Sequence, residues 1–280
     1  MSGAPDPLYV EARRVLLDAA EALAAHLDSI VLVGAQAIYL YTGDADLAVA
    51  EFTTDADLGV DPTNLAAEPL IDRLLRRGGF LPRDQPGGWV SASGVYLDLM
   101  VPEALAGSGR RSADLGAHGK RVARRTVGLE GAWIDCAPSV ITSLDPADPR
   151  QVTMNVAGPG ALLIAKLHKL GERVANDDRI KDKDALDIFR LLRAVPTDEL
   201  SRRLRRLLES ESAGPVTIAG LRLLQHLFGT VDDDGIRLAQ RASQHLIDPD
   251  ELGQSAASLT HELLNFLKSA TGRPTFDESS

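Results

Sequence analysis

The sequence has very little cysteine, few aromatic residues and no long apolar run. A single cysteine, Cys136, excludes an intrachain disulfide and suits a reducing compartment. Aromatic residues make up only 4% of the chain, so we do not expect a surface that stacks many unpaired bases. No apolar stretch approaches the roughly 20 residues of a membrane helix, and the N-terminus lacks the basic and apolar segments of a secretory signal. We therefore expect a soluble, cytoplasmic protein without a membrane partner.

An excess of positive charge is also missing. The 280 residues include 30 Lys and Arg against 40 Asp and Glu, a formal net charge of −10. This excludes non-specific nucleic-acid binding over the whole surface but leaves room for a local basic face. Two basic groups stand out along the chain: Arg110, Arg111, Lys120, Arg121, Arg124 and Arg125, and then Arg202, Arg203, Arg205 and Arg206. Each group could contact RNA phosphates; the alternative is a solvated face with scattered ion pairs.

The chain changes character near the Gly-Pro-Gly segment at 158–160. Before it, hydrophobic periodicity predicts helices at 8–27, 35–41 and 64–77 and strands at 30–33, 52–60, 89–91 and 95–101. After it, the pattern predicts helices at 161–174, 182–192, 197–208, 215–228, 233–245 and 249–269. We therefore expect an α+β protein, with a mixed sheet and helices in residues 1–155 and a helical bundle in residues 156–280.

A strand–glycine–helix junction is predicted where the apolar segment 30–33 meets Gly34 and Ala35. Such a junction exposes backbone N–H groups and the positive end of the helix dipole, which both favour a phosphate. Many α/β proteins have the same junction for packing reasons alone, so it needs support from other residues.

Two carboxylates, Asp55 and Asp57, alternate along the predicted strand 52–60. Residues i and i+2 of a strand point to the same face, so these side chains would project side by side. Adjacent carboxylates repel each other unless something positive lies between them, and Mg²⁺ prefers oxygen ligands. The alternative is a solvated turn at a strand end. Asp61 has the same parity, but Pro62 ends the strand, and we place Asp61 outside the site.

A third carboxylate, Asp98, interrupts the apolar strand predicted at 95–101. A lone aspartate in a buried strand is costly unless it is paired or bound to a metal. If this strand lies beside strand 52–60, Asp98 completes a three-carboxylate site. The alternative is that Asp98 is paired with an arginine.

These elements, in this order, resemble the nucleotidyltransferase superfamily, whose fold is polymerase-β-like. The helical half narrows the resemblance, because Lys166 is followed by the segment Lys183-Asp184 and by Asp187. This arrangement is similar to the AbiEii-type toxins of abortive-infection systems and to their MenT relatives. The resemblance covers roughly residues 28 to 193.

The resemblance implies a reaction in which a nucleoside monophosphate is transferred from an NTP to an acceptor, with RNA and in particular tRNA as the candidate. It implies that Asp55, Asp57 and Asp98 bind Mg²⁺ or Mn²⁺. A toxin of this family also implies a cognate antitoxin protein as a partner.

For the nucleotide, the resemblance makes Lys166 the catalytic lysine and Asp184 the downstream acidic residue. Gly34, Ala35, Lys166 and Lys169 would bind the NTP. The residues alone leave alternatives: Lys166 could be a surface lysine, and Asp184 could order either Lys166 or Lys183.

The chain departs from the family at two points. Ala35 stands where the family has Ser or Gly and has no hydroxyl for a phosphate, and the gap from Gly34 to Asp55 is long. Two further hypotheses therefore stand beside a toxin that modifies RNA. One is a transferase of the same fold that acts on a small molecule or on protein hydroxyls, and the other is a degenerate nucleotide-binding protein.

Overall fold

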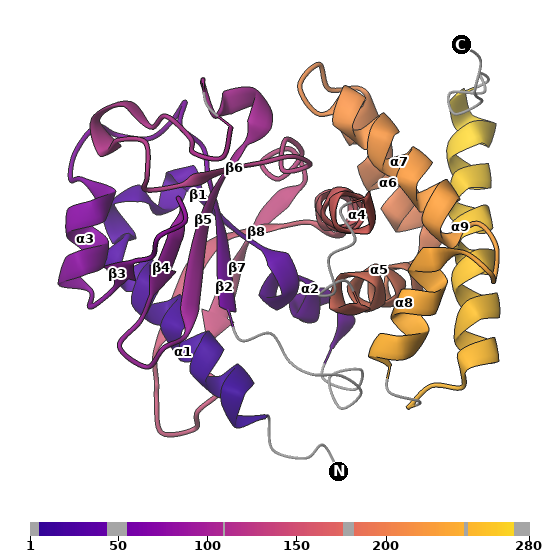
Figure 1. The fold of residues 1–280 in the computed structure, drawn as a ribbon, viewed down its shortest axis with the longest axis horizontal. Coiled ribbons are helices and arrows are strands. Elements are labelled where there is room, and N and C mark those ends of the chain that lie inside the picture. The colour runs from indigo at the N-terminus through magenta and orange to yellow at the C-terminus, as the bar shows by residue number, and fades with distance from the viewer. Residues whose placement is uncertain (1–5, 44–54, 109, 176–181, 244–245, 272–280) are drawn as a thin grey trace. The chain divides into compact units, whose positions relative to one another are not determined.

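The computed structural model describes residues 6–43, 55–108, 110–175, 182–243 and 246–271. The chain divides into two compact units (Figure 1). Unit 1 comprises Met1–Ala37 and Phe52–Ala157, and unit 2 comprises Ile38–Glu51 and Gly158–Ser280. The sequence places the boundary at residue 155 and does not anticipate that the segment from Ile38 groups with the second unit.

Unit 1 is built on a mixed sheet that has eight strands in the described part of the chain. The strands are β1 (Ile30–Val33), β2 (Asp55–Val60), β3 (Leu81–Pro82), β4 (Gly88–Val90), β5 (Tyr96–Pro102), β6 (Arg124–Thr126), β7 (Cys136–Thr142) and β8 (Gln151–Ala157). Their order is β3-β4-β5-β2-β1-β8-β7, and β6 pairs with β5 outside this path. The pairs β1–β8, β2–β5 and β5–β6 are parallel, and the other pairs are antiparallel.

The two central strands have an apolar face and a polar face. Leu58 of β2 and Leu97 and Leu99 of β5 are completely buried, and helix α1 (Pro7–Ala22) packs against both strands. Because side chains alternate along a strand, the residues between them point to the opposite face. Asp57 and Asp98 occupy that opposite face.

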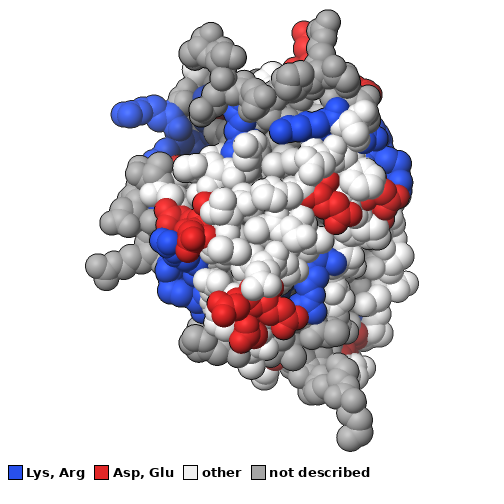
Figure 2. Space-filling model, turned by 90° about the vertical axis from the view of Figure 1, so that its right-hand side faces the viewer, with Lys and Arg blue, Asp and Glu red and all other residues white. Residues whose placement is uncertain are grey.

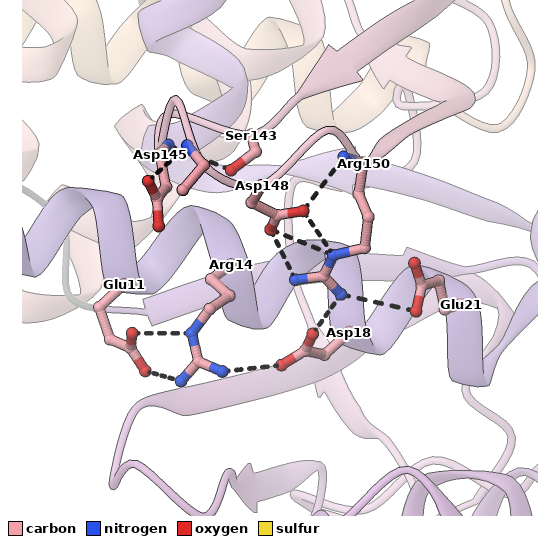
Figure 3. A network of polar contacts seen from close by, with 9 residues as sticks. Glu11, Arg14, Asp18, Glu21, Ser143, Asp145, Asp148 and Arg150 are labelled. Carbon is pink, nitrogen blue, oxygen red and sulfur yellow. Dashed lines mark hydrogen bonds and ion pairs between the residues drawn. The ribbon is translucent and has the colours of Figure 1, made fainter.

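Helix α1 is tied to the turn between β7 and β8 by a surface network of ion pairs (Figure 3). Arg150 lies 2.7 Å from Asp18 of α1 and 2.8 Å from Asp148 in the turn. Hydrogen bonds from the Arg150 side chain and backbone lower the pKa of Asp148 to about 2. At its N-terminus α1 is capped by Asp6, which accepts a hydrogen bond from the Leu8 N–H.

Two of the predicted helices are wrong in extent. The helix expected at 8–27 ends at Ala22, and a 3₁₀ helix, η1 (Ala24–Ser29), follows it. The helix expected at 64–77 is confined to α3 (Ile71–Arg77). Asp61 accepts hydrogen bonds from Thr63 and Asn64, which forms a side-chain turn before α3. In addition, Pro69 disfavours a helical conformation in the residue before it.

Unit 2 is helical. After α2 (Gly34–Thr42), which begins in unit 1, its helices are α4 (Pro159–Ala175), α5 (Asp182–Ala194), α6 (Thr197–Leu208), α7 (Gly214–Phe228), α8 (Asp234–Ala242) and α9 (Pro249–Thr271). Helix α4 packs against α5, α6 and α7, and α9 packs against α6. The chain is therefore a mixed sheet with helices followed by C-terminal helices, which agrees with the α+β class expected from the sequence.

Candidate functional site

The carboxylates of unit 1 lie on two adjacent parallel strands. Asp57 of β2 is aligned with Asp98 of β5, and Asp55 is aligned with Tyr96. Residues in register on neighbouring strands share a face, and Asp55 shares that face with Asp57. The expectation that the strand of Asp98 lies beside the strand of the pair is therefore confirmed. Asp57 is buried, whereas Asp55 and Asp98 are half-buried.

Gly34 marks the point where β1 ends and α2 begins, and Asp57 packs directly against it. Gly34 has φ of +70°, and a Cβ atom there would lie 2.0 Å from Oδ2 of Asp57 and 2.7 Å from its Cβ. Val33 is aligned with Asp57 across the β1–β2 pair, which explains the close approach. The positive end of the α2 dipole thus faces a carboxylate, which stabilises the negative charge. A phosphate at this junction would need a cation to offset Asp57.

Gln36, which the sequence analysis missed, holds the first turn of α2 in place. Its amide nitrogen donates to the backbone oxygens of Asp55 (3.0 Å) and Ala12 (3.1 Å). Its oxygen accepts a hydrogen bond from Arg13 at 3.0 Å. Gln36 therefore connects α1, α2 and the start of β2. The buried side chain of Ala35 adds no polar group beside it.

Asp98 is paired with an arginine, which was the alternative that the sequence left open. The Nη2 atom of Arg124 lies 3.2 Å from Oδ2 of Asp98. The other carboxylate oxygen, Oδ1, is buried and has no hydrogen-bond partner among the described residues. Such an unpaired acceptor is unfavourable, and a hydroxyl donor or a cation would satisfy it.

The carboxylates of unit 1 are the type of ligand that a divalent cation prefers, although their side chains do not surround one point. Among the described residues, no group of three or more His, Cys, Asp or Glu side chains is placed to hold a metal ion. The aligned Asp57 and Asp98 and the orphaned oxygen of Asp98 nevertheless supply the oxygen ligands that Mg²⁺ and Mn²⁺ use. Ligation of one ion would require a rotation of these side chains and the displacement of Arg124.

The predicted residues of unit 2 form a compact charge network. The Nζ atom of Lys166 lies 2.7 Å from Asp184 and 2.8 Å from Asp187, and the Lys166 side chain is only 7% exposed. The interpretation of Lys166 as a surface lysine is therefore wrong. Asp184 orders Lys166, as one of the two sequence-based alternatives predicted. The sequence places Asp187 one helical turn after Asp184 and on the same helix face, but it does not predict the direct contact of Asp187 with Lys166.

Electrostatics keep this network charged. Burial opposes the charged form of Lys166, but the attraction of Asp184 and Asp187 outweighs it and raises the pKa of the lysine well above its usual value. Burial likewise opposes ionisation of Asp184. The cations Lys166, Lys169 and Arg173 outweigh that effect and lower the pKa of this carboxyl.

Other cations surround the two aspartates of α5. Lys169 lies 3.5 Å from Asp184, Arg173 also contacts Asp184, and Arg190 lies 3.1 Å from Asp187. With Lys166, four cations among the described residues therefore contact two carboxylates. The side chains of Lys169 and Arg173 are 38% and 26% exposed, so these two cations, and not Lys166, are accessible to an anion from solvent.

Most of the two basic groups in the sequence are used in intramolecular contacts. In α6, Arg202 pairs with Asp198, Arg203 with Glu199, and Arg205 donates to the backbone oxygen of Phe266. In unit 1, Lys120 pairs with Asp114, Arg121 donates to the backbone oxygen of Asp84, and Arg125 pairs with Glu103. These contacts match the alternative of a face with scattered ion pairs.

One face of the molecule, seen from the side on which α9 lies in Figure 1, supports the same conclusion. Figure 2 shows small separate groups of basic and acidic side chains around a largely uncharged centre. The described residues on this face form no continuous basic surface.

No protein-family model, curated protein or solved structure matches the chain significantly. Within the described residues, no helix has both the length and the apolar character needed to span a membrane.

Proposed function

We propose that the chain is a metal-dependent nucleotidyltransferase that transfers a nucleoside monophosphate from an NTP to an acceptor. The observation that carries the proposal is the register of β2 and β5, which aligns Asp57 with Asp98 beside the glycine at the start of α2. Two aligned carboxylates, a buried unsatisfied oxygen and a helix N-terminus are the parts that a metal–triphosphate site requires.

In the proposed reaction, a hydroxyl of the acceptor attacks the α-phosphorus of the NTP and pyrophosphate leaves. Asp55, Asp57 and Asp98 would hold Mg²⁺ or Mn²⁺, which would activate the hydroxyl and stabilise the developing charge. The Oδ1 atom of Asp98, which is buried and has no hydrogen-bond partner among the described residues, would accept a hydrogen bond from the attacking hydroxyl.

In unit 2, the accessible cations of the charge network would bind phosphate groups. Lys169 and Arg173 are the accessible members of the network, and Lys166 holds the carboxylates against which they are positioned. We assign Lys166 a positioning role within unit 2, and we propose Lys169 in unit 2 and the Gly34–Ala35 junction in unit 1 as separate candidates for contacts with a nucleotide.

RNA, and in particular tRNA, remains the acceptor that we propose, with activity as the toxin of a toxin–antitoxin or abortive-infection system and an antitoxin protein as partner. A small molecule or a protein hydroxyl is the alternative acceptor. The paired arginines of α6 favour this alternative, because they leave little basic surface there for RNA.

The proposal is tested with labelled NTPs, Mg²⁺ and either total tRNA or the protein alone. We expect label on RNA, and we expect Asp57→Asn to reduce transfer by about 100-fold or more because it removes a charged metal ligand. Asp28→Asn is the matched control, because Asp28 is an exposed carboxylate of the same unit.

Three outcomes of this experiment separate the hypotheses. Label on the protein or on a small molecule supports the alternative acceptor. Full transfer by Asp57→Asn shows that the site assignment is wrong. Nucleotide binding without transfer to any acceptor indicates a degenerate nucleotide-binding protein.

A further inference from the structure

We propose that Arg124 is a further residue of the carboxylate site: it holds Asp98 while the site is empty and competes with a divalent cation for that carboxylate. This inference rests on the proposed function, because it deepens the same site. It explains why the carboxylates of two adjacent strands are not gathered around one point in the structure.

The backbone places Arg124 on the correct face of the sheet. Arg124 begins β6 and is aligned with Met100 of β5, two residues after Asp98. Met100 and Asp98 have the same parity, so Arg124 shares their face. Its guanidinium donates to Asp98 at 3.2 Å and also lies 3.0 Å from the Met100 sulfur and 3.1 Å from the Thr126 hydroxyl.

The contact between Arg124 and Asp98 is incomplete. Arginine pairs most strongly with a carboxylate when two N–H groups meet the two oxygens. Here one Arg124 nitrogen contacts Oδ2, and the buried Oδ1 has no hydrogen-bond partner within the described residues. Asp98 thus retains an oxygen for a second partner, which a fully formed bidentate pair would not provide.

Arg124 and a divalent cation would each offset the negative charge of Asp57 and Asp98. Neighbouring strands are about 4.8 Å apart, so the aligned Asp57 and Asp98 repel each other unless a positive charge offsets them. Arg124 supplies that charge in the empty site. A divalent cation bound by the same carboxylates would repel the guanidinium, and occupancy by one therefore opposes occupancy by the other.

A displaced Arg124 has a second use at this site. Its side chain is 30% exposed, so it can turn away from Asp98 without crossing the core. A guanidinium fork matches the oxygens of a phosphate, and a nucleotide arriving with the cation would supply them. Arg124 would then exchange a carboxylate partner for a phosphate partner.

The test measures Mn²⁺ binding by the loss of the electron paramagnetic resonance signal of free Mn²⁺, with circular dichroism to verify folding. Removal of the competing charge should make Arg124→Ala bind Mn²⁺ about tenfold more tightly than the wild-type chain. Arg124→Lys, which retains a charge, should bind more weakly than Arg124→Ala. Asp98→Asn should weaken binding in either background.

Arg125→Ala is the matched control. Arg125 is the next residue of β6, points to the other face and pairs with Glu103, so its removal should leave Mn²⁺ affinity unchanged. Equal or weaker Mn²⁺ binding by Arg124→Ala, or an equal gain in Arg125→Ala, would overturn the proposal.

A nucleotide arm, run at saturating Mn²⁺ so that the cation has displaced Arg124 from Asp98 in the wild-type chain, measures the second role of Arg124. Arg124→Ala should bind ATP several-fold more weakly than the wild-type chain, and unchanged ATP binding contradicts the exchange of partners.

The Mn²⁺ result does not depend on nucleotide transfer. If competition is found in a chain that transfers no nucleotide, Arg124 keeps this role and the nucleotidyltransferase proposal fails. If the wild type transfers nucleotide but Arg124→Ala has unchanged Mn²⁺ affinity, the nucleotidyltransferase proposal stands and the proposed role of Arg124 fails.

Discussion

At the scale of single residues, Lys166 shows what the sequence could and could not predict. The sequence predicts that Asp184 and Asp187 share a helix face, because they are one turn apart. It does not predict that both aspartates form ion pairs with Lys166, because these contacts depend on how α4 packs against α5. A buried ion pair is costly to form and costly to break from one side. Asp184 of this pair also contacts the more exposed Lys169 and Arg173.

Gly34 offers a prediction at the same scale, with a matched control in Gly43, the residue that follows α2. Gly34 and Gly43 have nearly the same φ, +70° and +72°, but only Gly34 faces Asp57, since a Cβ on Gly43 would meet nothing within 4 Å. Gly43→Ala should cost about 1 kcal/mol in the free energy of unfolding, the usual cost of a left-handed residue. Gly34→Ala should cost about 3 kcal/mol because the added methyl also displaces Asp57. Urea unfolding measures both, and equal costs would contradict the close packing of Gly34 and Asp57.

At the scale of elements, helices were easier to predict than the pieces between them. The helix predicted at 197–208 has the same limits as α6, because its polar and apolar residues alternate with a clear helical period. The sequence does not predict β6 and β7, because their side chains are mostly exposed or half-buried and neither strand contains an apolar run like that of β5. The helix expected from residue 64 was wrong because the side-chain turn at Asp61 precedes it and Pro69 interrupts it.

The turn between β7 and β8 carries a prediction of pH dependence. The pKa of Asp148 is lowered to about 2, so its bonds to Arg150 are complete above the usual aspartate value and are lost as the pH falls towards 2. The protection of the backbone amides in residues 143–150, measured as exchange rates corrected for the intrinsic effect of pH, should therefore fall between about pH 4 and pH 2 relative to the rest of unit 1. Asp148→Asn should exchange faster already at neutral pH and lose this pH dependence.

Asp145→Asn is the control for the same turn. Asp145 accepts a hydrogen bond from the Ala147 N–H and does not contact Arg150 in the network of Figure 3. It should therefore retain the acid-dependent loss of protection. If Asp148→Asn and the wild-type chain show the same pH profile, the network in Figure 3 does not hold the turn to α1.

At the scale of the whole molecule, the hydrophobic pattern along the chain predicted the fold class, whereas the sheet order required the structure. The α+β class follows from short apolar strands before residue 155 and helical periodicity after it. The pairing of β1 with β8 joins residues more than 120 positions apart, and no local pattern specifies such a contact. For the site, the sequence identified the carboxylates but not Arg124 or Gln36, because their roles depend on which strand or helix lies beside them.

The charge of the whole chain predicts how it would bind RNA. The formal net charge is −10, and the arginines of α6 are engaged in intramolecular contacts. We expect few phosphate contacts, so log K should fall against log[salt] with a slope shallower than about −2 for a single-stranded acceptor. Fluorescence anisotropy with labelled RNA, measured from about 50 to about 200 mM salt, gives this slope. A much steeper slope would mean that basic residues release their present partners to bind RNA.

The bridge made by Gln36 has a consequence for the order in which the protein is synthesised. The side-chain partners of Gln36 belong to residues 12, 13 and 55, so α1, α2 and the β1–β2 pair can come together once the first 60 or so residues have left the ribosome. The outer neighbours of this pair, β5 and β8, are made much later. Until β5 and β8 are made, β1 and β2 therefore have open outer edges, while the bonds of Gln36 can already link α2 to α1 and to the start of β2.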